Sequence, residues 1–157
     1  MTTQQPTKRQ GANAWKMGDI RISTHLCDGF SFCLSVGNYY IGRFFMQERE
    51  IEKVLNLLVK IGPGPEYSEY WHKEYKERTL RLKKLFILNI YGRRFLSSGT
   101  CFRIRKRIET QLTEQEWLWR IAHAGIVQAK IEYSRRMRLY FPHLSEEDVH
   151  RKLGYKK

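Results

Sequence analysis

The chain has 157 residues, with 29 Lys or Arg against 16 Asp or Glu, and therefore a formal net charge of +13. Its apolar content of 41 % and aromatic content of 13 % are higher than in disordered basic tails, so we expect a folded core. No apolar run approaches the ~20 residues of a membrane-spanning helix, and the polar first residues lack the apolar stretch of a secretory signal. Three cysteines are too few for a disulfide framework, and we expect an intracellular protein.

The positive charge is concentrated in the middle of the chain. Residues 73–107 hold 12 basic and 2 acidic side chains, so this stretch carries 12 − 2 = +10 of the net charge. Such a stretch repels itself unless a polyanion neutralises it, and the phosphate backbone of a nucleic acid is the usual partner. An acidic protein, an anionic membrane surface and a purely solubilising role are the alternatives. We favour nucleic acid and expect no membrane association.

The N-terminal part predicts an arm followed by two strands. Residues 1–14 are polar and offer nothing to bury, which predicts a disordered arm. Apolar residues then alternate with polar ones over 20–26 and 30–36, and this period of two indicates strands. A three-residue turn at 27–29, with Gly29 in the left-handed conformation, would pair even positions with even positions.

A third strand and a helix follow. The strand runs from Tyr39 to Met46, and its register is ambiguous because either odd or even positions could face the core. Acidic residues at 48, 50 and 52 favour a helix N-terminus, and the segment 62–65, Gly-Pro-Gly-Pro, ends the helix and forms a hinge over 63–66. Five apolar residues at helical spacing would cover the apolar sheet face: Ile51, Val54, Leu55, Leu58 and Ile61.

The opposite face of the sheet would carry small, basic and aromatic residues. Such a face suits a single strand, because bases stack on rings while Arg contacts phosphates; an ordinary solvent-facing surface is the alternative. In the order of its elements, the segment from Ile20 to Ile61 resembles the sheet-and-helix core of the positive-cofactor type of transcriptional coactivators and of other single-stranded nucleic-acid binders. The residues on this face are Arg21, Ser23, His25, Ser31, Cys33 and Ser35, joined by either Arg43 or the pair Tyr40 and Phe44, depending on the register.

The C-terminal half reads as helices. Apolar and aromatic residues keep three- and four-residue spacing from Tyr67 to Gly92, which favours one long helix, although residues 80–90 could also form a buried strand. A flexible connection is expected at 97–99. The densest basic cluster lies in residues 101–111, which could be a strand or a helix; we favour a helix and expect exposed basic side chains in both cases.

Two N-terminal capping patterns stand out near the end of the chain. Residues 113–116, Thr-Glu-Gln-Glu, form a capping box, and the spacing after it predicts one helix that continues to about Tyr140. Ser145 with Asp148 starts a last short helix, closed by Gly154, and residues 155–157 form a basic tail. A first helix of about 27 residues is too long for a helix-turn-helix, so we do not favour major-groove reading of duplex DNA.

No pattern for catalysis or for a cofactor is present. The chain has no phosphate-binding loop, dinucleotide fingerprint, paired carboxylates or serine-centred triad. Zinc prefers four closely paired ligands, whereas the sequence offers only three candidates at wider spacing, His25, Cys27 and Cys33. We therefore predict no metal, and a metal site at these three residues is the alternative. His25 and Cys27 would lie about 7 Å apart along a strand, which is too far for direct proton transfer. We therefore expect a binding protein rather than an enzyme.

Together, the patterns predict an α+β fold: a small three-stranded antiparallel sheet covered by one helix over 15–62, then a mainly helical basic half over 67–154. The predicted function is non-enzymatic binding of RNA or single-stranded DNA, with modest sequence preference. The alternatives are a small protein-interaction factor, such as a viral or phage accessory protein, that docks on an acidic partner, and a nucleic-acid-processing enzyme. Free sheet edges would allow a homo-oligomer. The residues expected to contact phosphates are Arg21, Arg43, Lys83, Lys84, Arg93, Arg94, Arg103, Arg105, Lys106 and Arg107.

Overall fold

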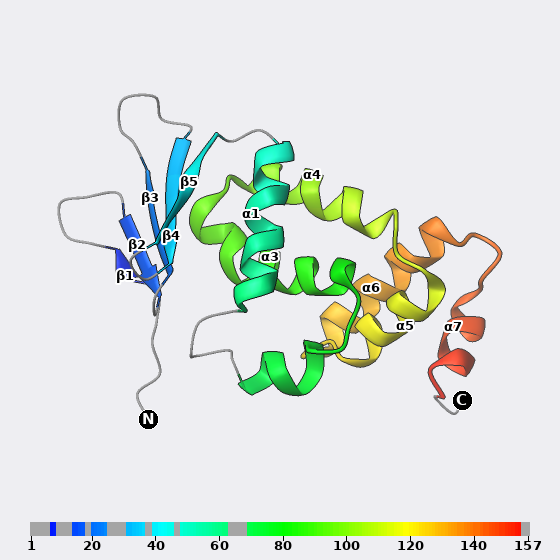
Figure 1. Cartoon of the computed structure of the whole chain (residues 1–157). Coiled ribbons are helices and arrows are strands. Elements are labelled where there is room, and N and C mark those ends of the chain that lie inside the picture. Colours follow the sequence, from blue (N-terminus) through cyan, green and yellow to red (C-terminus); the bar gives the residue numbers. More distant parts are fainter. Residues whose placement is uncertain are drawn as a thin grey trace. The chain divides into compact units, whose positions relative to one another are not determined.

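The computed structural model describes residues 7–8, 14–17, 20–24, 31–36, 39–45, 48–62 and 69–154 (Figure 1). The chain divides into two compact units, Met1–Ile104 and Arg105–Lys157, and each is described by itself. The elements of the first unit are β1 (Thr7–Lys8), β2 (Ala14–Met17), β3 (Ile20–Thr24), β4 (Ser31–Val36), β5 (Tyr39–Phe45), α1 (Glu48–Ile61), the π-helical turn η1 (Trp71–Tyr75) and α3 (Leu80–Phe95). The helix α4 (Ser98–Glu109) crosses the division, and the second unit continues with α5 (Glu114–Ala122), α6 (Val127–Tyr140) and α7 (Glu146–Lys152).

The strands form one antiparallel sheet in the order β1-β2-β3-β4-β5. Between β3 and β4, Ile20 pairs with Val36 and Ile22 pairs with Leu34, so even positions face even positions, which is the pairing that the alternating pattern predicts. The side chain of Leu34 is fully buried, because this side of the sheet lies against the helices. The turn predicted at 27–29 lies outside the described residues.

A β-bulge changes the register between β4 and β5. Leu34 pairs with Gly42, whereas the next residue, Ser35, pairs with Tyr40, so one residue of β5 is skipped. A bulge of this kind shifts the alternation of a strand by one position. Because of that shift, neither of the two predicted registers holds along the whole of β5.

The predicted fold class is wrong. The described chain is predominantly helical, and its sheet has five strands rather than three. The two additional strands are β1 and β2. Strand β1 lies inside the segment 1–14 predicted to be a disordered arm, and β2 begins at the last residue of that segment, Ala14. The alternation of apolar residues that marks a half-buried strand is missing there, so the backbone pairing of β1 and β2 left no signal of period two.

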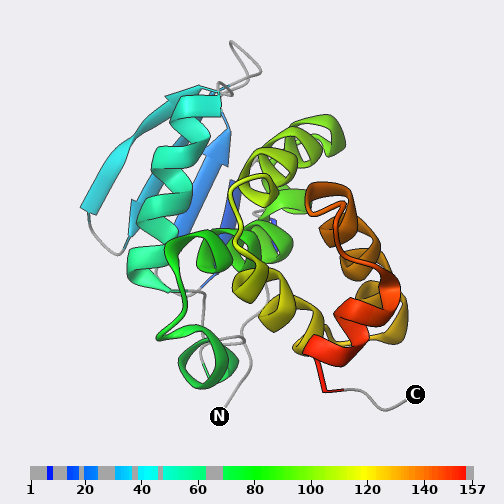
Figure 2. The ribbon, with the colours of Figure 1, turned by 90° about the vertical axis from the view of Figure 1, so that its right-hand side faces the viewer.

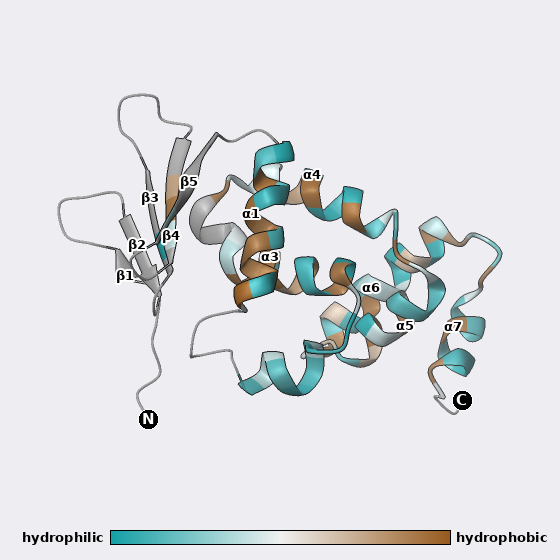
Figure 3. Cartoon of the chain, viewed as in Figure 1, coloured by the Kyte–Doolittle hydropathy of each residue, from teal (hydrophilic) through white to brown (hydrophobic). Residues whose placement is uncertain are grey.

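Helix α1 has the predicted bounds and packs against both β5 and α3. Figure 2 shows α1 lying across one face of the sheet, and Figure 3 shows the hydrophobic residues along α1 and α3. Four of the five predicted core residues are buried, and Ile61, in the last turn, is exposed. Gly62 then ends the helix with φ +89°, and its N–H donates to the carbonyl of Leu58 at 2.7 Å. The hinge predicted at 63–66 lies outside the described residues.

The single long helix predicted from Tyr67 to Gly92 is also wrong. Residues 71–75 form the turn η1, and a separate helix, α3, begins at Leu80 because Thr79 caps it, accepting a hydrogen bond from the Leu82 N–H at 3.4 Å. The alternative strand at 80–90 is therefore wrong as well. The two elements remain in contact through aromatic rings, since Tyr75 stacks on Phe86 with centroids 4.1 Å apart.

The second unit confirms both capping boxes but not the long helix between them. Thr113 with Glu116 caps α5, and Ser145 with Asp148 caps α7. The helix predicted to run to about Tyr140 is interrupted after α5, where Ile126 adopts an extended conformation (φ −135°, ψ 154°) before α6 begins. Glycine in a helix interior costs about 1 kcal/mol relative to alanine, and Gly125 lies at this interruption. No helix in the described ranges is both long and apolar enough to cross a membrane.

Candidate nucleic-acid interface

The basic cluster of residues 103–107 lies on α4, so the favoured helix is confirmed. Ser97 begins this helix: its Oγ accepts a hydrogen bond from the Thr100 N–H at 3.2 Å, and it lies 2.8 Å from the Thr100 hydroxyl. The flexible connection predicted at 97–99 is therefore wrong. Ile104 and Ile108 are buried, and this i, i+4 pair fixes which side of α4 faces the protein.

The opposite side of α4 presents an aromatic ring beside cations. Phe102 is 53 % exposed, and Arg103 and Lys106 are exposed as well. Residues four apart are neighbours on a helix surface, so Lys106 lies next to Phe102. Arg103 donates to the Thr100 hydroxyl at 3.4 Å, which keeps its guanidinium along the same helix. Arg105 and Arg107 are half-buried and flank this exposed face.

The basic side chains of α3 are less accessible to a nucleic acid than the sequence predicts. Lys84 is largely covered, and its Nζ lies 3.6 Å from Glu52 Oε1 on α1. Lys83 is half-buried, with its Nζ 6.0 Å from the centre of the Trp71 ring. The side chains of Arg93 and Arg94, also on α3, lie outside the described part. The structure therefore places both described α3 lysines in internal contacts.

The sheet carries a second surface of basic and aromatic character. Arg21 on β3 pairs with Ser35 on β4, and Ser35 pairs with Tyr40 on β5, so these residues form one row across the sheet. Directly opposite residues point to the same face; Arg21 is exposed, and Tyr40 is 64 % exposed. The Tyr40 hydroxyl lies 3.7 Å from the Cys33 Sγ, which confirms that the tyrosine shares the face of Cys33.

The β-bulge brings together two residues that the sequence offered as alternatives. Tyr40 pairs with Ser35, and Arg43 pairs with Cys33, two positions further along β4. Without the bulge, an even and an odd position of β5 would lie on opposite faces. Both positions of β5 therefore oppose residues of the same face of β4. The side chain of Arg43 lies outside the described part.

Other basic residues are removed from the surface by a buried ion cluster in the second unit. Glu109 on α4 contacts both Arg120 on α5 and Arg136 on α6, the latter at 3.2 Å, and the three side chains are 2 % to 14 % exposed. Burial lowers the pKa of Arg136, an effect that Glu109 opposes and that Arg120 enhances. The Arg120 guanidinium also lies 3.9 Å from the centre of the Tyr133 ring. These two arginines stabilise helix packing and are unavailable to a ligand.

The exposed phenylalanine of α4 is the feature that sequence reasoning missed. On a strand, Phe102 would share a face with Ile104, whereas on a helix the two lie on opposite sides, so its exposure depended on the choice between strand and helix. Its position directly before Arg103 and four residues before Lys106 was the available signal.

The candidate metal ligands are only partly among the described residues. His25 and Cys27 lie outside them, and within the described segments no three His, Cys, Asp or Glu side chains gather as metal ligands would. Comparison with known proteins gives no guide either, because no family model, no curated protein and no solved structure matches this chain.

Proposed function

We propose that the chain binds RNA or single-stranded DNA without catalysing a reaction on it, mainly through contacts to phosphates. The exposed face of α4 is the observation that carries this proposal: the exposed ring of Phe102 lies next to Lys106, and Arg103 is exposed on the same side of the helix. Such a surface suits a single strand, because an unstacked base can lie on the ring while the neighbouring cations meet phosphates of the same strand. The contacts to phosphate carry no sequence information, so sequence preference is modest.

Several cations outside α4 have acidic partners. Lys84 pairs with Glu52, Arg135 pairs with Glu132 at 2.6 Å, and Arg151 pairs with Asp148. By contrast, Lys106 has no acidic partner among the side chains that the structure describes. The face of the sheet that carries Arg21 and Tyr40 offers a second contact of the same chemistry.

Major-groove reading of a duplex is not favoured, although the interruption after α5 removes the length argument against a helix-turn-helix. Base edges are read mostly by polar and charged side chains such as Arg, Asn and Gln. The beginning of α6 instead exposes the aliphatic side chains of Ile126, Val127 and Ile131. Gln128 is exposed among them, but the aliphatic side chains offer no hydrogen bonds to the edges of base pairs.

The proposal includes an intracellular location, because the chain has few cysteines and intracellular nucleic acid would be its ligand. A homo-oligomer formed through the sheet edges also remains a prediction.

The decisive experiment measures the affinity of the whole chain for a labelled single-stranded RNA and DNA of mixed sequence over a range of salt concentrations. The double variant Arg103→Gln/Lys106→Gln is expected to weaken binding to both. Because each phosphate contact contributes about 0.7 to the slope of log affinity against log salt for a single strand, the variant should reduce that slope by about 1.4.

The matched control is Arg151→Gln/Lys152→Gln, which removes the same charge from α7, where Arg151 pairs with Asp148 and Lys152 pairs with Glu114 of α5. This control should retain nearly all of the affinity and the slope. Equal losses in both double variants would show that only net charge matters and would contradict an interface at α4. Absence of oligonucleotide binding, with binding to an acidic protein instead, would support the interaction-factor alternative, and degradation of the probe would support an enzyme.

A further inference from the structure

The second unit contains a pocket between α6 and α7, with a cavity of about 190 Å³. One end is aliphatic: Ile121 of α5 forms a buried wall, and Leu153 closes the side of α7. Val127 and Ile131 line the same end, yet they remain 70 % and 58 % exposed. Covering exposed aliphatic surface of this kind is favourable, so this end suits the apolar part of a ligand.

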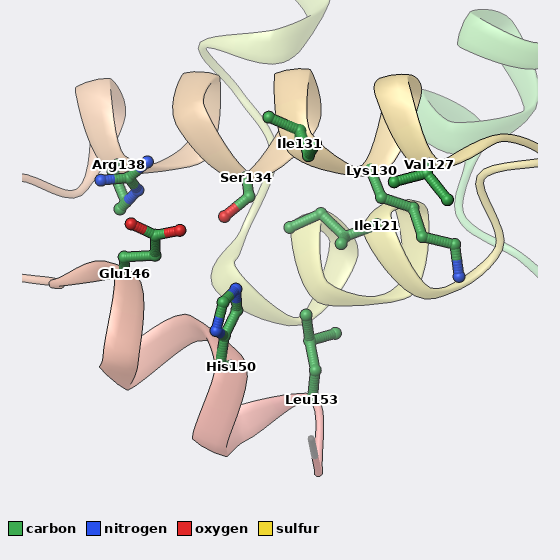
Figure 4. A pocket seen from close by; sticks show the side chains of 9 residues that line it. All are labelled: Ile121, Val127, Lys130, Ile131, Ser134, Arg138, Glu146, His150 and Leu153. Carbon is green, nitrogen blue, oxygen red and sulfur yellow. The ribbon is translucent and has the colours of Figure 1, made fainter. Parts of the chain in front are cut away.

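The other end of the pocket is polar and incompletely hydrogen-bonded. Ser134, one turn after Lys130 on α6, is only 8 % exposed, and its hydroxyl has no hydrogen-bond partner among the described residues. Figure 4 shows this hydroxyl directed into the pocket. Arg138, four residues further along the same helix, lines the pocket, and its buried Nε also has no partner within the described part. Buried polar groups are normally hydrogen-bonded, so the Ser134 hydroxyl, which faces the pocket, points to a missing ligand group.

Opposite charges meet at this polar end. Glu146 of α7 lies on the same side of the pocket as Arg138 (Figure 4), and no ion pair joins the two side chains in the described structure. A guanidinium and a serine hydroxyl together match a carboxylate, whereas a carboxylate such as Glu146 matches an ammonium group. Two other polar residues line the pocket. Lys130 already donates to the carbonyl of Ala122 at 3.3 Å. His150 lies on α7 between Glu146 and Leu153 (Figure 4).

We propose that this pocket binds a free α-amino acid with an apolar side chain. The ligand's carboxylate contacts Arg138 and Ser134, its ammonium group contacts Glu146, and its side chain covers Val127 and Ile131. The volume of the pocket agrees with a ligand of this size. An apolar cavity of about 150 Å³ accommodates benzene, and this somewhat larger cavity accommodates leucine. The inference does not depend on nucleic-acid binding, because none of these residues belongs to the proposed interface.

The test measures binding of L-leucine to the whole chain by titration calorimetry, alongside 4-methylpentanoate, which lacks the ammonium group, and 3-methylbutylamine, which lacks the carboxylate. Leucine should bind saturably, and each analogue should bind at least about tenfold more weakly, since each loses a charge-assisted hydrogen bond. No saturable binding of leucine at millimolar concentration, or equal affinity for all three compounds, overturns the proposal. Binding of an apolar peptide without binding of leucine also overturns the proposal.

Variants locate the ligand. Arg138→Gln and Glu146→Gln should each weaken leucine binding about tenfold or more, whereas Arg135→Gln, on the exposed side of the same helix, should not change it. Ser134→Ala should weaken binding by roughly three- to tenfold while raising the melting temperature of the free protein, because it removes a buried hydroxyl that has no partner. Retained affinity in Arg138→Gln, or a lowered melting temperature in Ser134→Ala, contradicts the assignment.

Discussion

At the scale of single residues, Gly92 shows a limit of sequence reasoning. Glycine usually marks a helix end, and the pattern placed a helix end there, but α3 continues through Gly92 to Phe95. The reason is tertiary: a Cβ at this position would lie 2.9 Å from Cys101 Sγ and 3.2 Å from Leu88 Cδ1. A close approach between α3 and α4 requires glycine, and no local signal records which helix will pack there.

This close approach predicts the effect of adding one methyl group. Gly92→Ala should destabilise the protein by about 1 kcal/mol, because the cost of overpacking exceeds the gain in helix propensity. Gly99→Ala is the matched control: it lies in α4, and the nearest atom to its new Cβ would be Arg103 Nη1 at 3.9 Å. This control should stabilise by up to about 1 kcal/mol. Urea unfolding measures both, and equal stabilisation by the two substitutions would refute the packing argument.

At the scale of elements, local signals were predictable and interruptions were not. The capping boxes at Thr113 and Ser145 were readable because each depends on residues only three positions apart. The breaks at residues 76–79 and 123–126 were missed, since apolar spacing continues across both and only the chain's path shows that it changes direction. Strands β1 and β2 were missed because they pair through the backbone without an apolar alternation.

The ion cluster that joins α4, α5 and α6 could not be seen in the sequence either, because its members are far apart along the chain. It predicts that Glu109→Gln destabilises the protein by about 3 kcal/mol or more, since Arg120 loses its buried acidic partner and Arg136 keeps only the more distant contact to Glu132, at 4.0 Å, among the described residues. The unfolding free energy in urea measures the change.

Glu132→Gln is the control for this prediction. It removes the exposed partner of Arg135 and a longer contact to Arg136, at 4.0 Å, while Glu109 stays in place. Exposed pairs contribute about 0 to 1 kcal/mol, so the loss should be small. A loss in Glu109→Gln no larger than in this control would show that the cluster does not hold the three helices together.

At the scale of the whole molecule, the net charge of +13 was evident from composition, but the availability of each cation was not. Pairing with acids covers Lys84, and burial removes Arg120 and Arg136. Charge alone attracts single strands and duplexes alike. Selectivity between them must come from exposed rings, since only unpaired bases can leave the stack and lie on an aromatic side chain.

Tyr40 tests this distinction on the sheet face. Tyr40→Leu should weaken binding of a single strand by about 1 to 3 kcal/mol, the value of one stacked base, while leaving duplex affinity and the slope against salt unchanged, because no cation is removed. Tyr40→Phe keeps the ring and loses only the hydroxyl near Cys33, so it should bind as the unchanged chain does. Competition between a labelled single strand and the duplex of the same sequence gives the ratio directly. If Tyr40→Leu lowers both affinities equally, or not at all, the strand does not lie on this face of the sheet, and stacking is left to Phe102 on α4.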